Sequence, residues 1–165
     1  MRIVCFVALL FLYACKSTTY YIVRHAEKQQ GTTMLSDPSL SAEGEKQAVD
    51  LANFLQNKNI KTIYATNYAR TIATAEPLRK QLGVNLKIYD AQKTTQLIDE
   101  LKKISDGNVL VVGHSNTVDD VVNGLMGVSK MSDLPDTEYG NVFIVKQKGN
   151  SYTFEKVKVP LTAPR

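Results

Sequence analysis

Both histidines of the 165-residue chain directly follow apolar runs, beside other residues that could take part in catalysis. The run YYIV leads into Arg24 and His25, and the run VLVV leads into a glycine and His114. A third run, IYAT, is followed after a short interval by Arg70. An imidazole can act as a nucleophile, and a guanidinium presents a planar fork of donors that suits phosphate oxygens. Such residues would suit phosphoryl transfer, with His25 as nucleophile and His114 as a donor to the equatorial oxygens.

The hydrophobic pattern predicts the elements that must bring these residues together. Runs rich in β-branched and aromatic residues predict strands at 20–23, 60–66, 86–90 and 108–112. Helical patterns alternate with them at 41–59, 69–83, 94–104 and 116–127. Ser41 is the expected N-cap of the first helix, and Pro77 predicts a kink or break in the second. Two last strands, within 142–147 and 151–159, flank a Gly-Asn turn.

This alternation predicts a three-layer α/β sandwich with a mostly parallel central sheet, helices on both faces and an antiparallel C-terminal hairpin at an edge. Ligands of such sheets collect at the carboxyl ends of the strands. Because Arg24, His25, Arg70 and His114 all follow predicted strands, we expect them to share one site at that edge.

Three motifs in this chain resemble those of the histidine phosphatase superfamily, which includes the cofactor-dependent phosphoglycerate mutases. They are RHA at 24–26, RTIATA at 70–75 and GHSN at 113–116, in the family's order, and the resemblance runs from about residue 19 to about 155. It implies that His25 is phosphorylated during turnover, and that water then hydrolyses the phosphohistidine. It also implies that Arg24, Arg70 and His114 hold the phosphoryl group, without a metal or another cofactor. Alanine at position 26 replaces the commoner glycine.

Most members of this family supply a carboxylic acid that protonates the leaving oxygen. Asp90, the last residue of the predicted third strand, is the candidate by position, although a loop or cap carboxylate would look the same. Glu27 is a rival that could instead pair with Lys28 or Arg70. Lys28 and Asn116 are further candidates for contact with the substrate, and Lys28 could equally face solvent.

The first residues have a different composition from the rest of the chain. One positive charge at Arg2 precedes the apolar stretch 3–14 and Cys15, and LYAC resembles a bacterial lipobox. The stretch is shorter than the roughly 20 residues that a membrane-spanning helix needs. We therefore expect a lipoprotein signal peptide at 1–14, a lipid-anchored tether at 15–19 attached through Cys15, and a phosphatase-like domain at 20–165. The membrane would then be a partner, on the periplasmic or cell-surface side of a bacterial envelope.

Charge and motif spacing disfavour several other functions. The net charge is +4, and the basic residues are scattered, which argues against nucleic-acid binding. An esterase elbow at Ser115 would need a glycine where Thr117 stands and a later histidine, which this chain lacks. A metal site that drew on both histidines with Glu27 or Asp119 would place a cation beside the arginines, which would repel it.

The sequence therefore predicts a phosphatase that hydrolyses small phosphate monoesters. The main alternative is an inactive lipoprotein of the same fold that binds phosphorylated ligands or a protein partner. Lesser alternatives are a mutase-type phosphotransferase, which would need inserted segments to cover its site, and a protein phosphohistidine phosphatase, whose phosphorelay substrates lie in the cytoplasm.

Overall fold

The computed structural model describes residues 17–31 and 36–161, in which strands and helices alternate up to a final pair of strands. In chain order they are β1 Ser17–Arg24, α1 Ala42–Leu55, β2 Ile60–Thr66, α2 Ala69–Leu82, β3 Leu86–Tyr89, α3 Thr94–Leu101, β4 Asn108–Gly113, α4 Val118–Met126, β5 Asn141–Lys148 and β6 Ser151–Lys158. The expected signal peptide and Cys15 lie outside the described residues.

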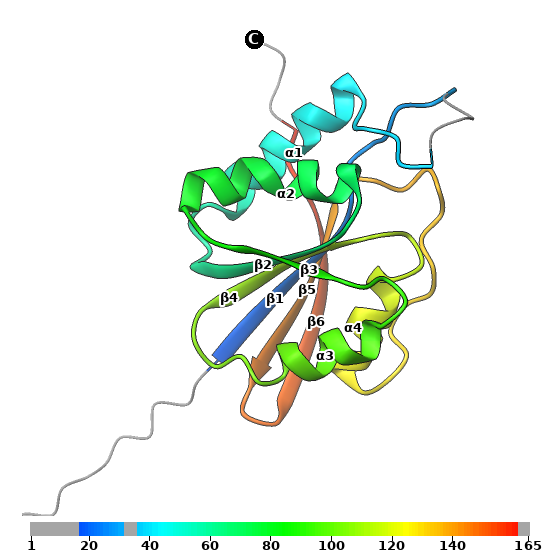
Figure 1. The fold of residues 1–165 in the computed structure, drawn as a ribbon. Helices are drawn as coiled ribbons and strands as arrows, with labels where there is room; N and C mark the ends of the chain where they lie inside the picture. The colour runs from blue at the N-terminus through cyan, green and yellow to red at the C-terminus, as the bar shows by residue number, and fades with distance from the viewer. Residues whose placement is uncertain (1–16, 32–35, 162–165) are drawn as a thin grey trace, which may run out of the picture.

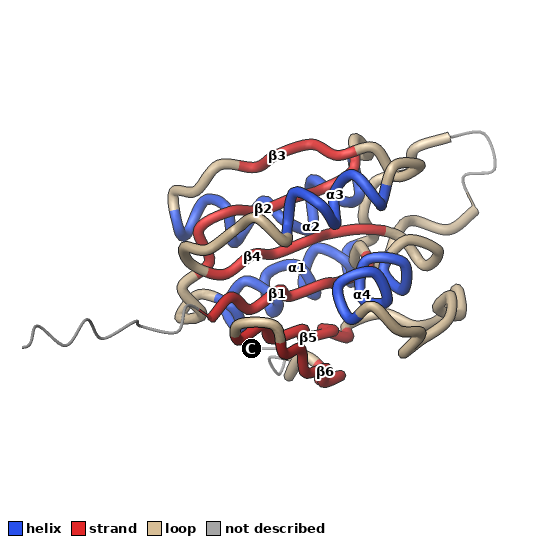
Figure 2. The backbone as a smooth tube through the Cα atoms, turned by 90° about the horizontal axis from the view of Figure 1, so that it is seen from below, coloured by secondary structure: helices blue, strands red, loops and turns tan. Residues whose placement is uncertain are grey.

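The strands form one six-stranded sheet in the order β3-β2-β4-β1-β5-β6 (Figure 2). The first four strands in this order are parallel, whereas β5 is antiparallel to β1 and pairs with β6 in the hairpin. Helices α1 and α2 cover one face and α3 and α4 cover the other (Figure 1). The predicted α/β class, with an antiparallel C-terminal pair at an edge, is confirmed.

Strand β1 is buried on both faces, which explains its uninterrupted apolar run. Tyr20 and Ile22 pack into the core beneath α3 and α4, whereas Tyr21 and Val23 pack into the core beneath α1 and α2. Successive side chains of a strand point to opposite faces, so each apolar residue of the run fills one of the two cores. β1 is thereby fixed in the middle of the sheet.

Several element bounds differ from the sequence prediction, and Pro77 does not break α2. β1 begins at Ser17, so residues 17–19 belong to the sheet and not to the tether, because β5 pairs with them and Asn108 Oδ1 accepts the Thr19 N–H at 2.8 Å. α2 continues through Pro77 to a left-handed cap at Gly83. α3 ends at Leu101, before the predicted 104. Among the described residues, no helix combines the length and the apolar character that a membrane crossing would require.

Candidate active site

The carboxyl ends of β1, β2 and β4 lie level with one another and carry the predicted site residues. In the parallel register, Arg24 stands opposite Gly113, and Ala65 stands opposite Val112. A pocket of about 330 Å³ opens at this edge. Its lining includes Arg24, His25, Lys28, Arg70, His114 and Asn116. The fold therefore brings the four residues of the three motifs into one pocket.

His25 is held as a neutral imidazole with one defined tautomer. Its side chain is buried, and its Nδ1 lies 2.8 Å from the Ala26 carbonyl oxygen, an acceptor. Nδ1 therefore carries the proton, and Nε2 keeps its lone pair. Burial, together with the positive charge of Arg24 and Arg70, lowers the His25 pKa to about 3. The Ala26 N–H donates to Thr74 Oγ1 at 2.9 Å, which fixes the segment that orients the ring.

His114 faces His25 across the pocket, with ring centroids 5.5 Å apart. Its Nδ1 lies 3.4 Å from Arg70 Nη2, which can only donate, so Nδ1 accepts and Nε2 donates to Thr66 Oγ1 at 2.8 Å. Burial and the charges of Arg70 and Arg24 lower the His114 pKa to about 4. A phosphoryl dianion between the rings would reverse this electrostatic effect and favour a protonated Nδ1 that donates to it.

Gly113, which directly precedes His114, lies where a larger side chain would clash with its neighbours. A Cβ atom at this position would lie 2.7 Å from Thr117 Oγ1 and 2.8 Å from the Tyr89 hydroxyl oxygen. The His114 N–H donates to that same Thr117 Oγ1 at 2.9 Å. The hydrogen bond from His114 to Thr117 thus fixes the turn that orients His114, and only glycine fits at position 113.

Arg24 is held by the segment 135–139, which follows α4. Its Nη1 donates to the Pro135 carbonyl oxygen at 2.9 Å, and the Tyr139 ring centroid lies 4.4 Å from its Cζ. Asp136 Oδ1 lies 3.4 Å from Nη2. The buried Nε of Arg24 has no hydrogen-bond partner. The guanidinium is therefore fixed in place by this segment.

Arg70 is held in a similar way from the opposite side, by Asp37. Asp37 Oδ1 accepts from Arg70 Nη1 at 3.1 Å, and Oδ2 accepts the Ala69 N–H at 2.8 Å. Because the N-cap residue Tyr68 makes no side-chain capping bond, Asp37 caps α2 from a distant loop. The Nε of Arg70 is also buried and lacks a partner. Both arginines are thus held by loop residues, and both have a buried Nε without a partner.

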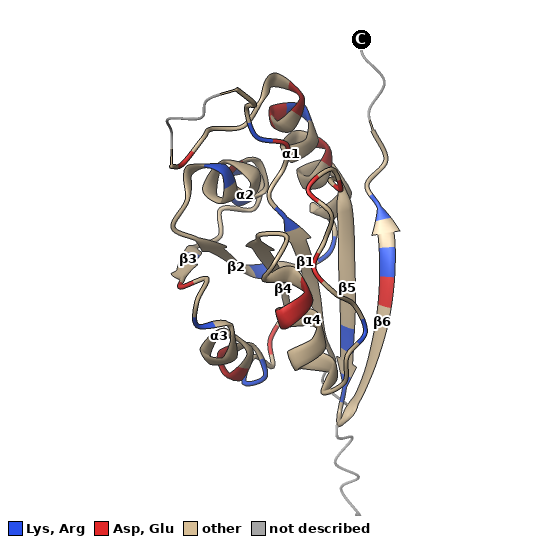
Figure 3. Ribbon diagram, turned by 90° about the vertical axis from the view of Figure 1, so that its right-hand side faces the viewer, with Lys and Arg blue, Asp and Glu red and all other residues tan. Residues whose placement is uncertain are grey.

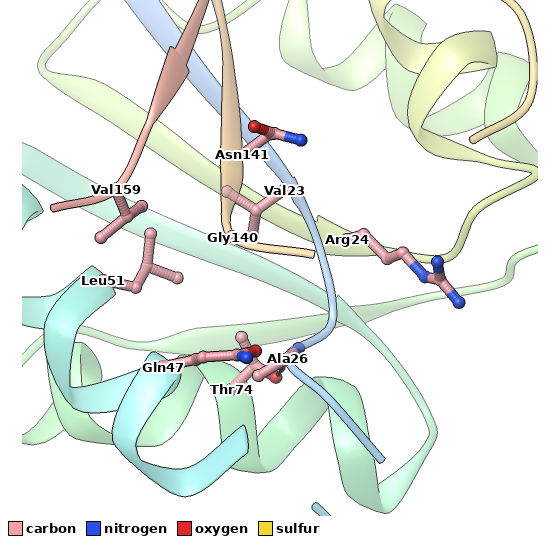
Figure 4. A pocket seen from close by; sticks show the side chains of 9 residues that line it. All are labelled: Val23, Arg24, Ala26, Gln47, Leu51, Thr74, Gly140, Asn141 and Val159. Carbon is pink, nitrogen blue, oxygen red and sulfur yellow. Dashed lines mark hydrogen bonds between the residues drawn. The ribbon is translucent and has the colours of Figure 1, made fainter. Parts of the chain in front are cut away.

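A second, much smaller cavity lies behind Arg24 on the side of α1. Figure 4 shows Val23, Leu51 and Val159 around it, with the guanidinium of Arg24 directed away from them. The charged end of Arg24 therefore belongs to the larger pocket.

Lys28 and Asn116 line the pocket as predicted candidates for substrate contact, but Glu27 does not. Glu27 Oε1 accepts the Ser41 hydroxyl at 2.8 Å, and its carbonyl oxygen accepts the Ser41 N–H at 2.9 Å. A Cβ atom at Gly44 would overlap that carbonyl, so α1 packs directly against it. In this geometry Glu27 secures the start of α1.

Asp90 also stands outside the pocket lining. Its Oδ1 accepts the Gln92 N–H at 2.9 Å, and its Oδ2 lies 3.6 Å from Lys93 Nζ. Among the described lining residues, Asp136 alone carries a carboxyl group. Sequence reasoning missed Asp37 and Asp136 because both lie in loops, where no periodicity shows which way a side chain points. Within the described chain, no group of three or more His, Cys, Asp or Glu residues could hold a metal ion.

We predict that these buried histidines make the protein less stable in mild acid. Their folded-state pKa values of about 3 and about 4 lie below the ordinary 6.5, so the unfolded chain binds protons first as the pH falls. Their contribution to stability is complete above about pH 6.5 and is lost as the pH falls toward about 4 for His114 and about 3 for His25, by at most roughly 1.4 kcal/mol per histidine per pH unit. Urea unfolding across this range should show a weaker pH dependence in His114→Asn than in the wild type. Equal slopes would contradict the prediction.

The chain was compared with protein families and with curated proteins. Residues 20–92 match the family model of the histidine phosphatase superfamily, branch 1. No curated protein matches the chain significantly by sequence.

Solved structures share the fold at low sequence identity. Phosphoglycerate mutase from Bacillus anthracis is 19% identical, with a TM-score of 0.65 over 87% of this chain and 93% of that one. The protein histidine phosphatase SixA, solved with tungstate, is 18% identical, with a TM-score of 0.68 over 85% and 96% of the two chains. A mycobacterial glucosyl-3-phosphoglycerate phosphatase is 14% identical, with a TM-score of 0.67 over 87% and 98%.

Proposed function

Because the chain has the fold and the N-terminal motifs of the histidine phosphatase superfamily, we propose that it is a phosphatase that hydrolyses small phosphate monoesters through a phosphohistidine on His25. The observation that carries this proposal is the meeting of two arginines and two neutral histidines in one pocket. A phosphoryl group supplies oxygen acceptors that suit guanidinium donors.

The proposed reaction has two displacement steps at phosphorus. His25 Nε2 attacks the phosphorus, the N–P bond forms, and the P–O bond to the leaving group breaks. Nδ1 keeps its proton throughout, because the Ala26 carbonyl oxygen accepts it. A water molecule then attacks the phosphohistidine, which releases orthophosphate and the neutral imidazole. Arg24, Arg70 and protonated His114 would stabilise the equatorial oxygens in both steps.

A generic aryl phosphate would test the activity. We expect the purified chain to release phosphate without added metal, with competitive inhibition by tungstate or vanadate. An inactive phosphate-binding protein of this fold would bind those anions but release no phosphate. The B. anthracis mutase is almost fully covered by this chain, so length does not separate mutase from phosphatase. Incubation with 3-phosphoglycerate separates them, because a mutase yields 2-phosphoglycerate and a phosphatase yields glycerate.

We further propose that Asp136 is the proton donor to the leaving oxygen. Its carboxyl group lies at the pocket, next to Arg24, which would hold the phosphoryl group. Asp136→Asn should reduce kcat/KM for alkyl phosphates by roughly a hundredfold, because a poor leaving group needs the proton. It should change kcat/KM for p-nitrophenyl phosphate severalfold at most.

Asp133→Asn is the matched control, because Asp133 is an exposed carboxylate in the same loop and does not line the pocket. It should behave as the wild type with both substrates. An equal loss with both substrates in Asp136→Asn would overturn the role of proton donor and leave only a role in holding Arg24.

We also propose that the protein acts outside the bacterial cytoplasm, attached to a membrane through a lipid on Cys15. The support is the short apolar stretch 3–14 before Cys15. Metabolic labelling with a fatty acid should mark the wild type, whereas Cys15→Ser should remain unlabelled.

A further inference from the structure

β1 connects the two ends of the sheet, with Ser17 at one end and the pocket residue Arg24 at the other. Its eight residues span about 23 Å at roughly 3.3 Å per residue. Cys15 stands only two residues before Ser17 in the sequence, and two residues of chain reach at most about 7 Å between Cα atoms. Whatever holds Cys15 therefore faces the end of the sheet opposite the pocket.

Three turns surround the start of β1 at this end. The Thr18 hydroxyl donates to the Ile104 carbonyl oxygen at 3.2 Å, in the turn after α3. Ser17 pairs with Lys148 at the β5–β6 turn. The turn between α1 and β2 joins the group through Asn108, whose Nδ2 donates to the Lys58 carbonyl oxygen at 2.6 Å.

These turns are rich in lysine. We call the segments 56–61, 102–107 and 147–151 the basic end. Its charged residues are Lys58, Lys61, Lys102, Lys103, Lys148 and Asp106. All six are exposed. The excess of four positive charges equals the net charge of the entire chain, which is also +4. Figure 3 shows part of this charge at the lower end of β5.

Acidic residues close to the basic end offset its lysines only in part, through the charge of Glu100 near Lys103. None of the five forms a salt bridge with an acidic residue in the part of the chain that the structure describes. Two acidic residues, Asp99 and Glu100, lie nearby in the last turn of α3. Glu100 is already bonded to Lys87 and to the Tyr64 hydroxyl. The remaining loop at this end, 83–85, carries no charge.

We propose that the basic end rests on anionic phospholipid headgroups, so that the pocket faces away from the bilayer. The proposal rests on the anchor at Cys15 and adds an orientation to it. The short connection brings this end to the membrane, and five exposed lysines complement the negative charge of the surface. Each lysine near an anionic leaflet strengthens binding by about fivefold.

Chemical footprinting of the full chain in vesicles would test this orientation. The chain is reconstituted in vesicles of phosphatidylcholine alone, or with added phosphatidylglycerol, and exposed lysines are acetylated by a membrane-impermeant reagent. With phosphatidylglycerol, the five lysines of the basic end should react at least roughly threefold more slowly than without it. Lys46 and Lys93 serve as internal controls, because both are exposed on elements that begin at the pocket edge, and their rates should not change.

Salt and a double variant separate the possible outcomes. Protection should vanish in about 1 M salt, where the Debye length falls to roughly 3 Å. Lys102→Gln with Lys103→Gln should weaken protection of Lys58, whereas Lys46→Gln should not.

Equal protection on both vesicle types would mean that the tether alone sets the orientation, which would overturn the proposal. Failure of the chain to co-sediment with either vesicle would overturn the anchor together with this proposal, whereas phosphate release would remain a separate measurement.

Discussion

Replacing His25 by alanine is expected to abolish phosphate release from every ester tested. Alanine offers no nucleophile, and the only other histidine, His114, has its Nε2 bonded to Thr66. Removal of a nucleophile lowers kcat by roughly 10⁵-fold or more. Rapid acid-free quenching of the wild type with radiolabelled substrate should trap an acid-labile phosphate, and peptide mapping should place it on His25.

The His25→Ala variant should still fold, because the altered side chain lies at the end of β1 and outside both large core clusters. Its circular dichroism spectrum and its binding of tungstate provide the control for folding. A folded variant that keeps more than a small fraction of wild-type activity would contradict the mechanism, and so would label on another residue.

Replacing Arg24 by alanine is expected to cause the second largest loss. The pocket would lose a guanidinium that we propose stabilises the phosphoryl oxygens, and removal of one such donor costs about 10²-fold to 10³-fold in kcat. The segment 135–139 would also lose its bond to Nη1, so Asp136 would no longer be held at the pocket. We therefore expect kcat/KM for p-nitrophenyl phosphate to fall by at least a hundredfold, measured in steady-state assays.

Arg24→Lys tests whether charge alone is sufficient. Lysine keeps the positive charge but cannot both bond to the Pro135 carbonyl oxygen and present a second, fixed donor, so it should recover only a minor part of the activity. Arg79→Ala is the matched control, because Arg79 lies on α2 and pairs with Glu76 away from the pocket. Full recovery by lysine would show that the planar fork of Arg24 is not required.

The sequence predicted strands and helices best where a regular hydrophobic pattern ended at a residue with a clear preference for that end. β2 has the predicted bounds, 60–66, and Ser41 caps α1 as expected because its hydroxyl accepts the Gly44 N–H at 3.0 Å. The meeting of His25 with His114 could also be predicted, because the carboxyl ends of parallel strands share one edge. In each case a local pattern determined the geometry.

Loop residues could not be placed from the sequence in the same way. Asp37 and Asp136 meet the two arginines across 33 and 112 residues of chain, and no local pattern specifies such contacts. Glu27 was a candidate acid by its distance along the chain from His25. Its side chain instead meets Ser41, because the bridge between Lys28 and Leu40 brings the start of α1 beside it. Contacts of residues 39–41 with residues 27–29 decided this outcome.

The central position of β1 also determines when the pocket can form during synthesis. β1 is the first described strand, yet its two neighbours in the sheet are β4 and β5, and β5 extends to Lys148. Pairing between such distant segments forms late in folding, because a long loop must first close. The ribosome must therefore complete most of the chain before His25 reaches its final surroundings. Until β4 has been synthesised, the backbone groups of β1 have neither of their native partner strands.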